Sequence, residues 1–231
     1  MDWMRRYDLF LFDFDGLLVN TEHLHFEAYV RMCRRRGVEL TWDFSRYCMA
    51  AHFESTGIRD QMFEEFPEIS LQEPEWERLY KEKKSSYMEL LHEGAVRLMP
   101  GAEDLLLALQ EEGIKRCVVT HSSLEQVEAI RKQNPILNTI PRWFTREDYS
   151  HPKPHPECYL KAIESLVKDP YRVVGFEDSP RGLKALKASP ADAVFISSIQ
   201  YPNQEEILKG TIAHYESLTN LFAVQDNLRK P

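Results

Sequence analysis

A short, wholly apolar run that ends in an acid constrains this chain most. Leu9-Phe10-Leu11-Phe12 comes directly before Asp13, and a turn glycine follows at Gly16. A run this short, without polar alternation, is typical of a strand buried on both faces of a parallel sheet. We therefore expect a strand within residues 7–14. Further short apolar runs predict strands within residues 115–120, 142–145, 172–176 and 191–197.

Segments with helical spacing of apolar residues lie between these predicted strands. Ser122-Ser123-Leu124-Glu125 resembles a capping box, and Ser179-Pro180 fits an N-cap followed by proline at the first helical position. The expected helices cover residues 102–112, 124–133 and 156–167, and a fourth follows Ser179. Because short buried strands alternate with helices, the sequence predicts an α/β fold, a doubly wound, Rossmann-like parallel sheet with helices on both faces.

The segment of residues 20–95 interrupts this alternation. It contains no convincing buried strand, and its fifteen acidic and ten basic residues give it a net charge of −5. Its periodicity predicts amphipathic helices over residues 22–36, 42–51, 55–65 and 75–92. We expect a helical insertion at 20–95 in an α/β core formed by residues 1–19 and 96–231, with Pro100-Gly101 marking the return.

Composition narrows the functional classes. The chain has 231 residues, 43% of them hydrophobic, and a net charge of −8. These values are those of a folded globular protein, and the acidic balance argues against a nucleic-acid partner or an anionic membrane surface. The four cysteines form no CxxC pair, and no apolar run is long enough to span a bilayer or to act as a signal peptide. We expect reduced thiols and a cytoplasmic location.

The ends of the predicted strands deliver acids, a hydroxyl and a lysine. In open α/β sheets the functional site lies at the carboxyl ends of the strands, so groups distant in sequence should converge there. Four carboxylates packed together are costly unless a divalent cation and a lysine offset their charge. Hard oxygen ligands favour Mg²⁺ as that cation. The residues expected to converge are Asp13, Asp15, Thr120, Lys153, Glu177 and Asp178.

Each of these features alone has an ordinary structural interpretation. Asp13 and Asp15 could be solvated acids of a turn, and Glu177-Asp178 could favour the dipole at a helix N-terminus. Their occurrence together, in order, at the ends of separate strands favours a site.

Four segments resemble the motifs of the haloacid-dehalogenase-like (HAD) phosphohydrolases, over about residues 8–197. They are Asp13-Phe14-Asp15-Gly16-Leu17-Leu18-Val19-Asn20-Thr21-Glu22, Thr120-His121-Ser122, Lys153-Pro154-His155-Pro156 and Gly175-Phe176-Glu177-Asp178-Ser179-Pro180-Arg181-Gly182. The insertion is similar to the helical cap domain of the subgroup that contains β-phosphoglucomutase and small phosphatases. The resemblance implies an α/β core, Rossmann-like, with an inserted helical cap.

The resemblance also implies roles for individual residues. Asp13 would attack phosphorus, and Asp15 would protonate the leaving oxygen and then activate water. Asp13, the backbone carbonyl of Asp15 and Asp178 would hold Mg²⁺, with Glu177 as a direct or water-mediated ligand. Thr120 and the backbone N–H of His121 would grip the phosphoryl group, and Lys153 would screen charge. His25 would either contact the acid/base Asp15, as a histidine does in the mutases, or be an interfacial helix residue.

The resemblance implies a Mg²⁺-dependent phosphatase acting on a small phosphorylated metabolite through an aspartyl-phosphate. A phosphosugar mutase is the alternative, but residues 49–59 lack the Gly-x-Ser/Thr-Arg pattern of mutase caps, and Arg59 is either a substitute phosphate clamp or an exposed helix residue. Asn20 and His121 also depart from the usual Asp and Asn. The presence of a second aspartate, Asp15, argues against a true haloacid dehalogenase. A binding protein that has lost catalytic activity is a further alternative. The sequence does not specify the oligomeric state, and a monomer is among the open alternatives.

Overall fold

The computed structural model describes residues 3–54, 56–168 and 171–223. Its contacts group the chain into two compact units, Met1–Asn20 with Arg97–Pro231, and Thr21–Val96. We call the first the core unit and the second the inserted unit. A hydrogen bond joins the last residue of the core unit before the insertion to the first residue after it. The Asn20 N–H donates to the Arg97 carbonyl at 2.8 Å. That the two units are a catalytic domain and a cap domain stays a prediction.

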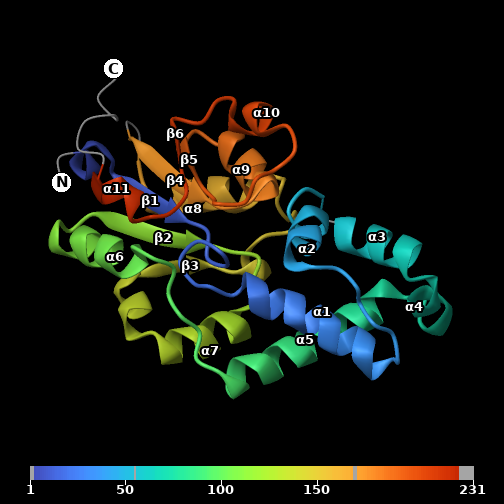
Figure 1. The fold of residues 1–231 in the computed structure, drawn as a ribbon. Coiled ribbons are helices and arrows are strands. Elements are labelled where there is room, and N and C mark those ends of the chain that lie inside the picture. The colour runs from blue at the N-terminus through green and yellow to red at the C-terminus, as the bar shows by residue number, and fades with distance from the viewer. Residues whose placement is uncertain (1–2, 55, 169–170, 224–231) are drawn as a thin grey trace. The chain divides into compact units, whose positions relative to one another are not determined.

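A six-stranded parallel sheet forms the centre of the core unit, in the order β3-β2-β1-β4-β5-β6 (Figure 1). The order reverses direction between β1 and β4, and this switch point is where ligands bind in open α/β sheets. The register places Leu11 beside both Cys117 and Gly175. The strands are β1 (Leu9–Phe12), β2 (Lys115–Val119), β3 (Arg142–Phe144), β4 (Val173–Glu177), β5 (Asp192–Ile196) and β6 (Ala213–Tyr215).

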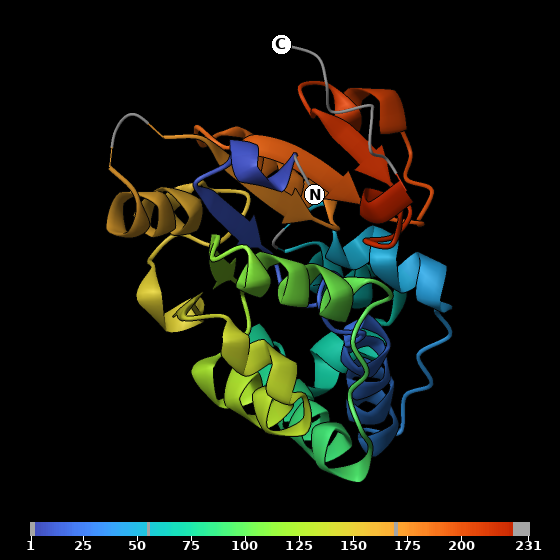
Figure 2. The same cartoon turned by 90° about the vertical axis from the view of Figure 1, so that its left-hand side faces the viewer.

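Helices cover both faces of this sheet, which confirms the predicted doubly wound α/β architecture. In Figures 1 and 2, α6 and α7 lie on one face, and α8 and α9 lie on the other. All four side chains of β1 are fully buried, as expected for a strand between two helical layers. The helices of the core unit are α6 (Ala102–Glu111), α7 (Leu124–Gln133), α8 (Glu157–Leu166), α9 (Pro180–Lys187), α10 (Gln204–Leu208) and α11 (Asn220–Ala223).

Side-chain caps begin two of these helices, one at the predicted position and one a residue later than predicted. The Ser123 hydroxyl accepts the Gln126 N–H, and the Gln126 side chain accepts the Ser123 N–H, so α7 opens with a capping box. The predicted box over residues 122–125 is therefore displaced by one residue, with Ser123 and Gln126 in the places expected for Ser122 and Glu125. Ser179 caps α9 by accepting the Gly182 N–H at 3.1 Å, with Pro180 at the first helical position.

The inserted unit is helical throughout its regular structure, as expected. Arginines of α1 and of its C-cap pair with glutamates of α5, among them Arg31 with Glu93 at 2.7 Å and the C-cap Arg36 with Glu82 at 2.6 Å. Its helices are α1 (Glu22–Arg35), α2 (Phe44–Ala51), α3 (Gly57–Glu65), α4 (Pro67–Gln72) and α5 (Trp76–Glu93). The predicted helix from residue 55 begins only at Gly57, and Ser55 itself lies outside the described residues.

The sequence analysis missed the elements beyond residue 197 and one short helix. Strand β6 adds Ala213-His214-Tyr215 to the sheet. Because each of these residues is only half-buried, the strand has no run of apolar residues from which it could be predicted. Helix α4 starts at Pro67, which reads as a break between helices although proline is well suited to a first helical turn.

The four cysteines are buried free thiols, as predicted. Among the described residues, no helix combines the length and the apolar character that crossing a bilayer requires.

Two glycines with positive φ differ in how closely the chain packs against them, and this difference can be tested. A Cβ at Gly101 (φ +84°) would lie 2.5 Å from the backbone N of Thr219, whereas a Cβ at Gly113 (φ +64°) would have no atom within 4 Å. We expect Gly113→Ala to cost about 1 kcal/mol of unfolding free energy from backbone strain alone. Gly101→Ala should cost about 3 kcal/mol, because backbone must also move. Urea unfolding measures both, and equal losses would contradict the close contact at Gly101.

Candidate active site

Three acids converge where β1 and β4 end. Asp13 follows β1, and its N–H donates to the Phe176 carbonyl of β4 at 3.0 Å, so the two strand ends are tied together. Glu177 is the last residue of β4, and Asp178 follows it. All three side chains are buried, and one carboxylate oxygen of each lies within 4.8 Å of the others. This arrangement can hold a metal ion.

Lys153 neutralises part of this acid cluster. Its Nζ donates to Asp13 Oδ1 at 2.6 Å, to Glu177 Oε1 at 2.6 Å and to the Val119 carbonyl at 3.0 Å. Burial lowers the pKa of the ammonium, but the charges of Asp13 and Glu177 outweigh it, so the pKa of Lys153 stands well above its ordinary value. The lysine is therefore a fixed positive charge at the ends of β1 and β4.

One lysine does not compensate three buried acids. Burial raises the pKa of Asp13 to about 8, although Lys153 lowers it, and Glu177 and Asp15 raise it further. Glu177 Oε2 is buried and has no hydrogen-bond partner among the described residues. A buried carboxylate oxygen without a partner is costly. Hard oxygen donors that lack compensating charge suit a divalent cation such as Mg²⁺.

Asp15 is held by two hydroxyl groups that follow β2. Its Oδ2 accepts from Ser122 Oγ at 2.6 Å and from Thr120 Oγ1 at 3.4 Å, and Thr120 Oγ1 accepts the Ser122 N–H at 2.9 Å. The carboxyl group therefore has a defined orientation next to the cluster. The sequence analysis quoted Ser122 within a motif but gave it no role, since a serine after a strand is ordinary.

His121 anchors the loop that carries Lys153. Its Nε2 accepts the backbone N–H of Lys153 at 2.8 Å. Burial, then the positive charges of Arg181 and Lys153, lower the pKa of His121 well below its ordinary value, so the ring is a neutral acceptor at pH 7. This side-chain contact gives His121 a positioning role. A grip of its backbone N–H on phosphate stays a prediction.

Two residues that the sequence analysis did not single out shape the environment of Glu177. The hydroxyl of the buried Tyr159 donates a hydrogen bond to Glu177 Oε1. Gly182 leaves room for the same carboxylate, because a Cβ there would lie 2.0 Å from Glu177 Oε2. Tyr159 falls within the helix predicted over residues 156–167, and Gly182 ends one of the quoted segments, but neither position predicts a contact with Glu177 from the sequence.

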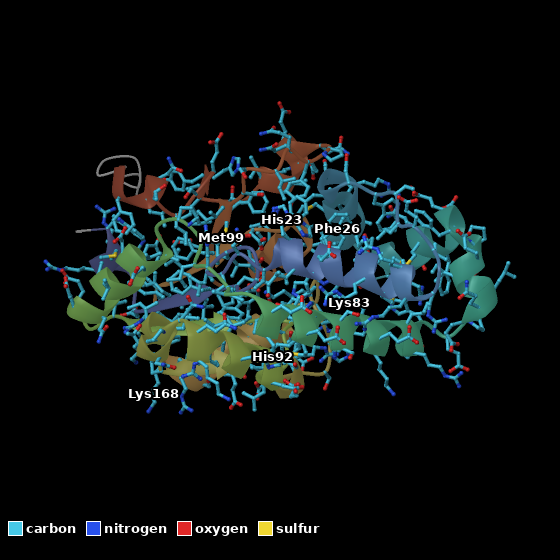
Figure 3. All side chains as sticks on the ribbon, turned by 60° about the horizontal axis from the view of Figure 1, so that its bottom comes forward. His23, Phe26, Lys83, His92, Met99 and Lys168 are labelled. Atoms are coloured by element: carbon cyan, nitrogen blue, oxygen red, sulfur yellow. The ribbon has the colours of Figure 1, made fainter. Side chains whose placement is uncertain are left out.

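The residues of the inserted unit that the sequence analysis discussed have partners within that unit. His25 Nδ1 lies 2.6 Å from Nζ of the buried Lys83, which Figure 3 labels on α5, and the His25 ring stacks on Tyr87. Lys83 was not predicted to be functional. Arg59 pairs with its neighbour Asp60 at 2.8 Å, and its side chain is 40% exposed. The role of His25 toward Asp15 stays a prediction.

Comparisons with known proteins relate the whole arrangement to one family. The sequence model described as haloacid dehalogenase-like hydrolase matches residues 10–196. A phosphorylated carbohydrates phosphatase of Thermotoga maritima is 32% identical over 197 residues, which cover 80% of this chain and 82% of that protein. A validoxylamine A 7'-phosphate phosphatase of Streptomyces hygroscopicus is 31% identical, covering 78% of this chain and 81% of that protein.

Solved structures agree on the fold. The structure of CbbY from Rhodobacter sphaeroides in complex with phosphate superposes with a TM-score of 0.73 at 26% identity, covering 93% of this chain and 96% of that one. A β-phosphoglucomutase from Clostridium difficile gives a TM-score of 0.75 at 22% identity, covering 96% of this chain and 97% of that one. The second likeness supports the fold alone.

Removal of the lysine charge tests the electrostatic description. Lys153→Met should lower the unfolding free energy of the metal-free protein by about 3–5 kcal/mol at pH 7, because it leaves buried acids unpaired. Lys161→Met removes an exposed lysine, paired with Glu157 at 2.9 Å, and should cost about 1 kcal/mol or less. Urea unfolding in the presence of a chelator compares them. A loss for Lys153→Met as small as that for Lys161→Met would contradict the description.

Proposed function

Because the chain belongs to the haloacid dehalogenase-like hydrolases, we propose that it is a Mg²⁺-dependent phosphatase of small phosphorylated metabolites. The observation that supports this most is the contact of Lys153 with both Asp13 and Glu177, beside Asp178. Such a site offers a carboxylate nucleophile, a fixed positive charge and a metal-binding set within one cluster. The relatives from Thermotoga maritima and Streptomyces hygroscopicus are named as phosphatases.

The metal proposed for the site is Mg²⁺. Asp13, Glu177 and Asp178 supply the hard oxygen donors that this ion prefers, and the backbone carbonyl of Asp15 would complete the set. The buried Glu177 Oε2, without a hydrogen-bond partner among the described residues, fits a role toward a cation. When bound, the ion supplies positive charge to the phosphate oxygens as negative charge develops on them.

In the proposed first step, a carboxylate oxygen of Asp13 attacks phosphorus. The bond from phosphorus to the ester oxygen breaks, and Asp15 gives its proton to that leaving oxygen. The hydrogen bonds from Ser122 and Thr120 to Asp15 Oδ2 support this role, because they fix the carboxyl group that must deliver the proton. The product is an alcohol and a phosphoryl group covalently bound to Asp13.

In the proposed second step, water attacks the same phosphorus. Asp15, now ionised, takes a proton from the water, and the bond between phosphorus and the Asp13 oxygen breaks. Inorganic phosphate leaves and both aspartates return to their starting states. Lys153, protonated throughout, offsets the charge on Asp13 and on the phosphoryl oxygens, and Thr120 and the His121 N–H are the proposed donors to that group.

We further propose that the core domain comprises residues 1–19 and 96–231 and that residues 20–95 form a helical cap domain. The grouping of contacts into a core unit and an inserted unit, with boundaries one residue away, supports this division. The role proposed for the cap is to exclude bulk water during phosphoryl transfer.

A phosphosugar mutase is the alternative, and a cap that held a second phosphate would favour it. Arg59, the residue of the inserted unit considered for that task, is paired with Asp60 and partly exposed, which favours the hydrolase. Product analysis with a hexose 1-phosphate distinguishes the two. Free phosphate supports the phosphatase, and an isomeric sugar phosphate supports the mutase.

Replacement of the proposed nucleophile should abolish turnover. Asp13→Asn keeps the shape of the side chain but removes the attacking carboxylate, so phosphate release from p-nitrophenyl phosphate should fall by at least about 10³-fold. Asp104→Asn changes an exposed acid on α6 and should leave the rate within about twofold of wild type. Activity of Asp13→Asn close to that of the control would contradict the assignment.

Removal of the proposed metal should abolish the activity of the Asp13 cluster. A chelator should abolish phosphate release, and added Mg²⁺ should restore it. Asp178→Asn should raise the Mg²⁺ concentration for half-maximal activity by at least about tenfold, because a ligand loses its charge. Asp104→Asn again serves as the control and should leave this concentration unchanged. Full activity in the chelator would show that no metal is needed.

A further inference from the structure

A second group of metal-ligating side chains lies on the loop that carries Lys153. His151 and His155 stand two residues before and after the lysine, and Glu157 begins helix α8. One ring nitrogen of each histidine and one carboxylate oxygen of Glu157 lie within 4.8 Å of one another. Both imidazoles are exposed, and their ring centroids are 4.7 Å apart.

The chemistry of this group differs from that of the Asp13 cluster. Imidazole nitrogens suit Zn²⁺ and neighbouring transition metals, whereas Mg²⁺ prefers oxygen. Two histidines and one carboxylate are a ligand set from which Zn²⁺ completes a tetrahedron with water. Zinc–nitrogen bonds of about 2.0–2.1 Å place neighbouring tetrahedral ligands about 3.4 Å apart. Since the ligand atoms lie within 4.8 Å of one another, their separations would have to change by at most about 1.4 Å. Exposed imidazole rings can make this movement.

Hydrogen bonds orient the carboxylate of this group. Glu157 accepts the N–H of Ser150 at 3.1 Å and that of His151 at 2.8 Å, and Lys161 Nζ lies 2.9 Å from it. His151 Nδ1 lies 2.7 Å from Glu157 Oε2. Carboxylate ligands of metal sites are commonly held by such outer partners, which fix the ligand before the ion arrives.

The backbone between the ligands is restrained as well. Prolines stand at positions 152, 154 and 156, and each fixes its own φ. The His155 N–H donates to the Pro152 carbonyl at 3.0 Å, and the Glu157 N–H donates to His155 Nδ1 at 3.2 Å. A restrained loop loses little conformational entropy when it binds a ligand.

We propose that His151, His155 and Glu157 bind a Zn²⁺ ion on the surface of the core unit, at a site separate from the Asp13 cluster. The ion would join the two sides of the turn that holds Lys153 and would stabilise the folded protein through its binding free energy. The proposal does not depend on the phosphatase reaction, since none of the three residues has a role in it.

Calorimetric titration of tag-free protein with Zn²⁺, in millimolar Mg²⁺ to occupy the oxygen-rich cluster, tests the proposal. Wild type should bind one equivalent of Zn²⁺. His151→Ala and His155→Ala should each weaken this binding by at least about tenfold, since loss of even an outer partner of a ligand commonly costs 10–100-fold. The matched control is His92→Ala, an exposed histidine of α5 that Figure 3 labels, and it should bind as wild type.

Thermal unfolding gives a second readout that separates lost ligands from lost structure. Without zinc, the two loop variants should melt within about 4 °C of wild type, because both imidazoles are exposed and their contacts with Glu157 contribute little at the surface. Zinc should raise the melting temperature of wild type and of His92→Ala but not that of the double variant His151→Ala/His155→Ala. Absence of zinc binding in wild type, or equal binding by wild type and the double variant, would overturn the proposal.

Discussion

The contact of one buried ammonium with two buried carboxylates is the interaction on which the site depends. Lys153 lies 140 residues from Asp13 and 24 from Glu177 in sequence, yet its Nζ is 2.6 Å from an oxygen of each. Three buried charges lose much hydration free energy, and only close, well-oriented contacts offset that cost. The lysine thereby joins the end of β1, the end of β4 and the loop before α8.

This arrangement does not serve stability alone. The pKa of Asp13 is raised to about 8 by burial despite the lysine, and Glu177 keeps a buried oxygen without a partner among the described residues. Acids that are held together against their electrostatic preference are typical of functional sites, where a ligand compensates them. The fully buried strand β1 provides the packing that offsets this local cost. Gly182 contributes by the absence of a side chain, which lets α9 approach the Glu177 carboxylate.

The sequence was informative wherever a strand is buried on both faces. The apolar run at Leu9–Phe12 located β1. Parallel strands present their carboxyl ends at one edge of a sheet, and this rule correctly predicted that Asp13, Glu177 and Asp178 lie together. Strand β1 occupies only Leu9–Phe12 of the range of residues 7–14 within which it was predicted. Phe14 is buried but lies in a turn, where its carbonyl accepts the N–H groups of Leu17, Leu18 and Val19.

The pattern of apolar and polar residues does not predict other features of the structure. The half-buried residues of β6 lack an apolar run, so its pairing with β5 depends on tertiary contacts. Tyr159 fits helical periodicity as a core residue, and this periodicity does not reveal that its hydroxyl reaches Glu177. The approach of Lys83 to His25 within the inserted unit likewise depends on how α1 and α5 pack, which one sequence does not specify.

The central claim is that a phosphoryl group passes through Asp13, and trapping that species tests it most directly. In Asp15→Asn, p-nitrophenyl phosphate can still react, since its leaving group needs no proton, but the second step lacks its base. Acid quenching followed by peptide mapping should therefore find a phosphoryl group on Asp13. Release of phosphate without an adduct on Asp13, or an adduct on another residue, would contradict the account.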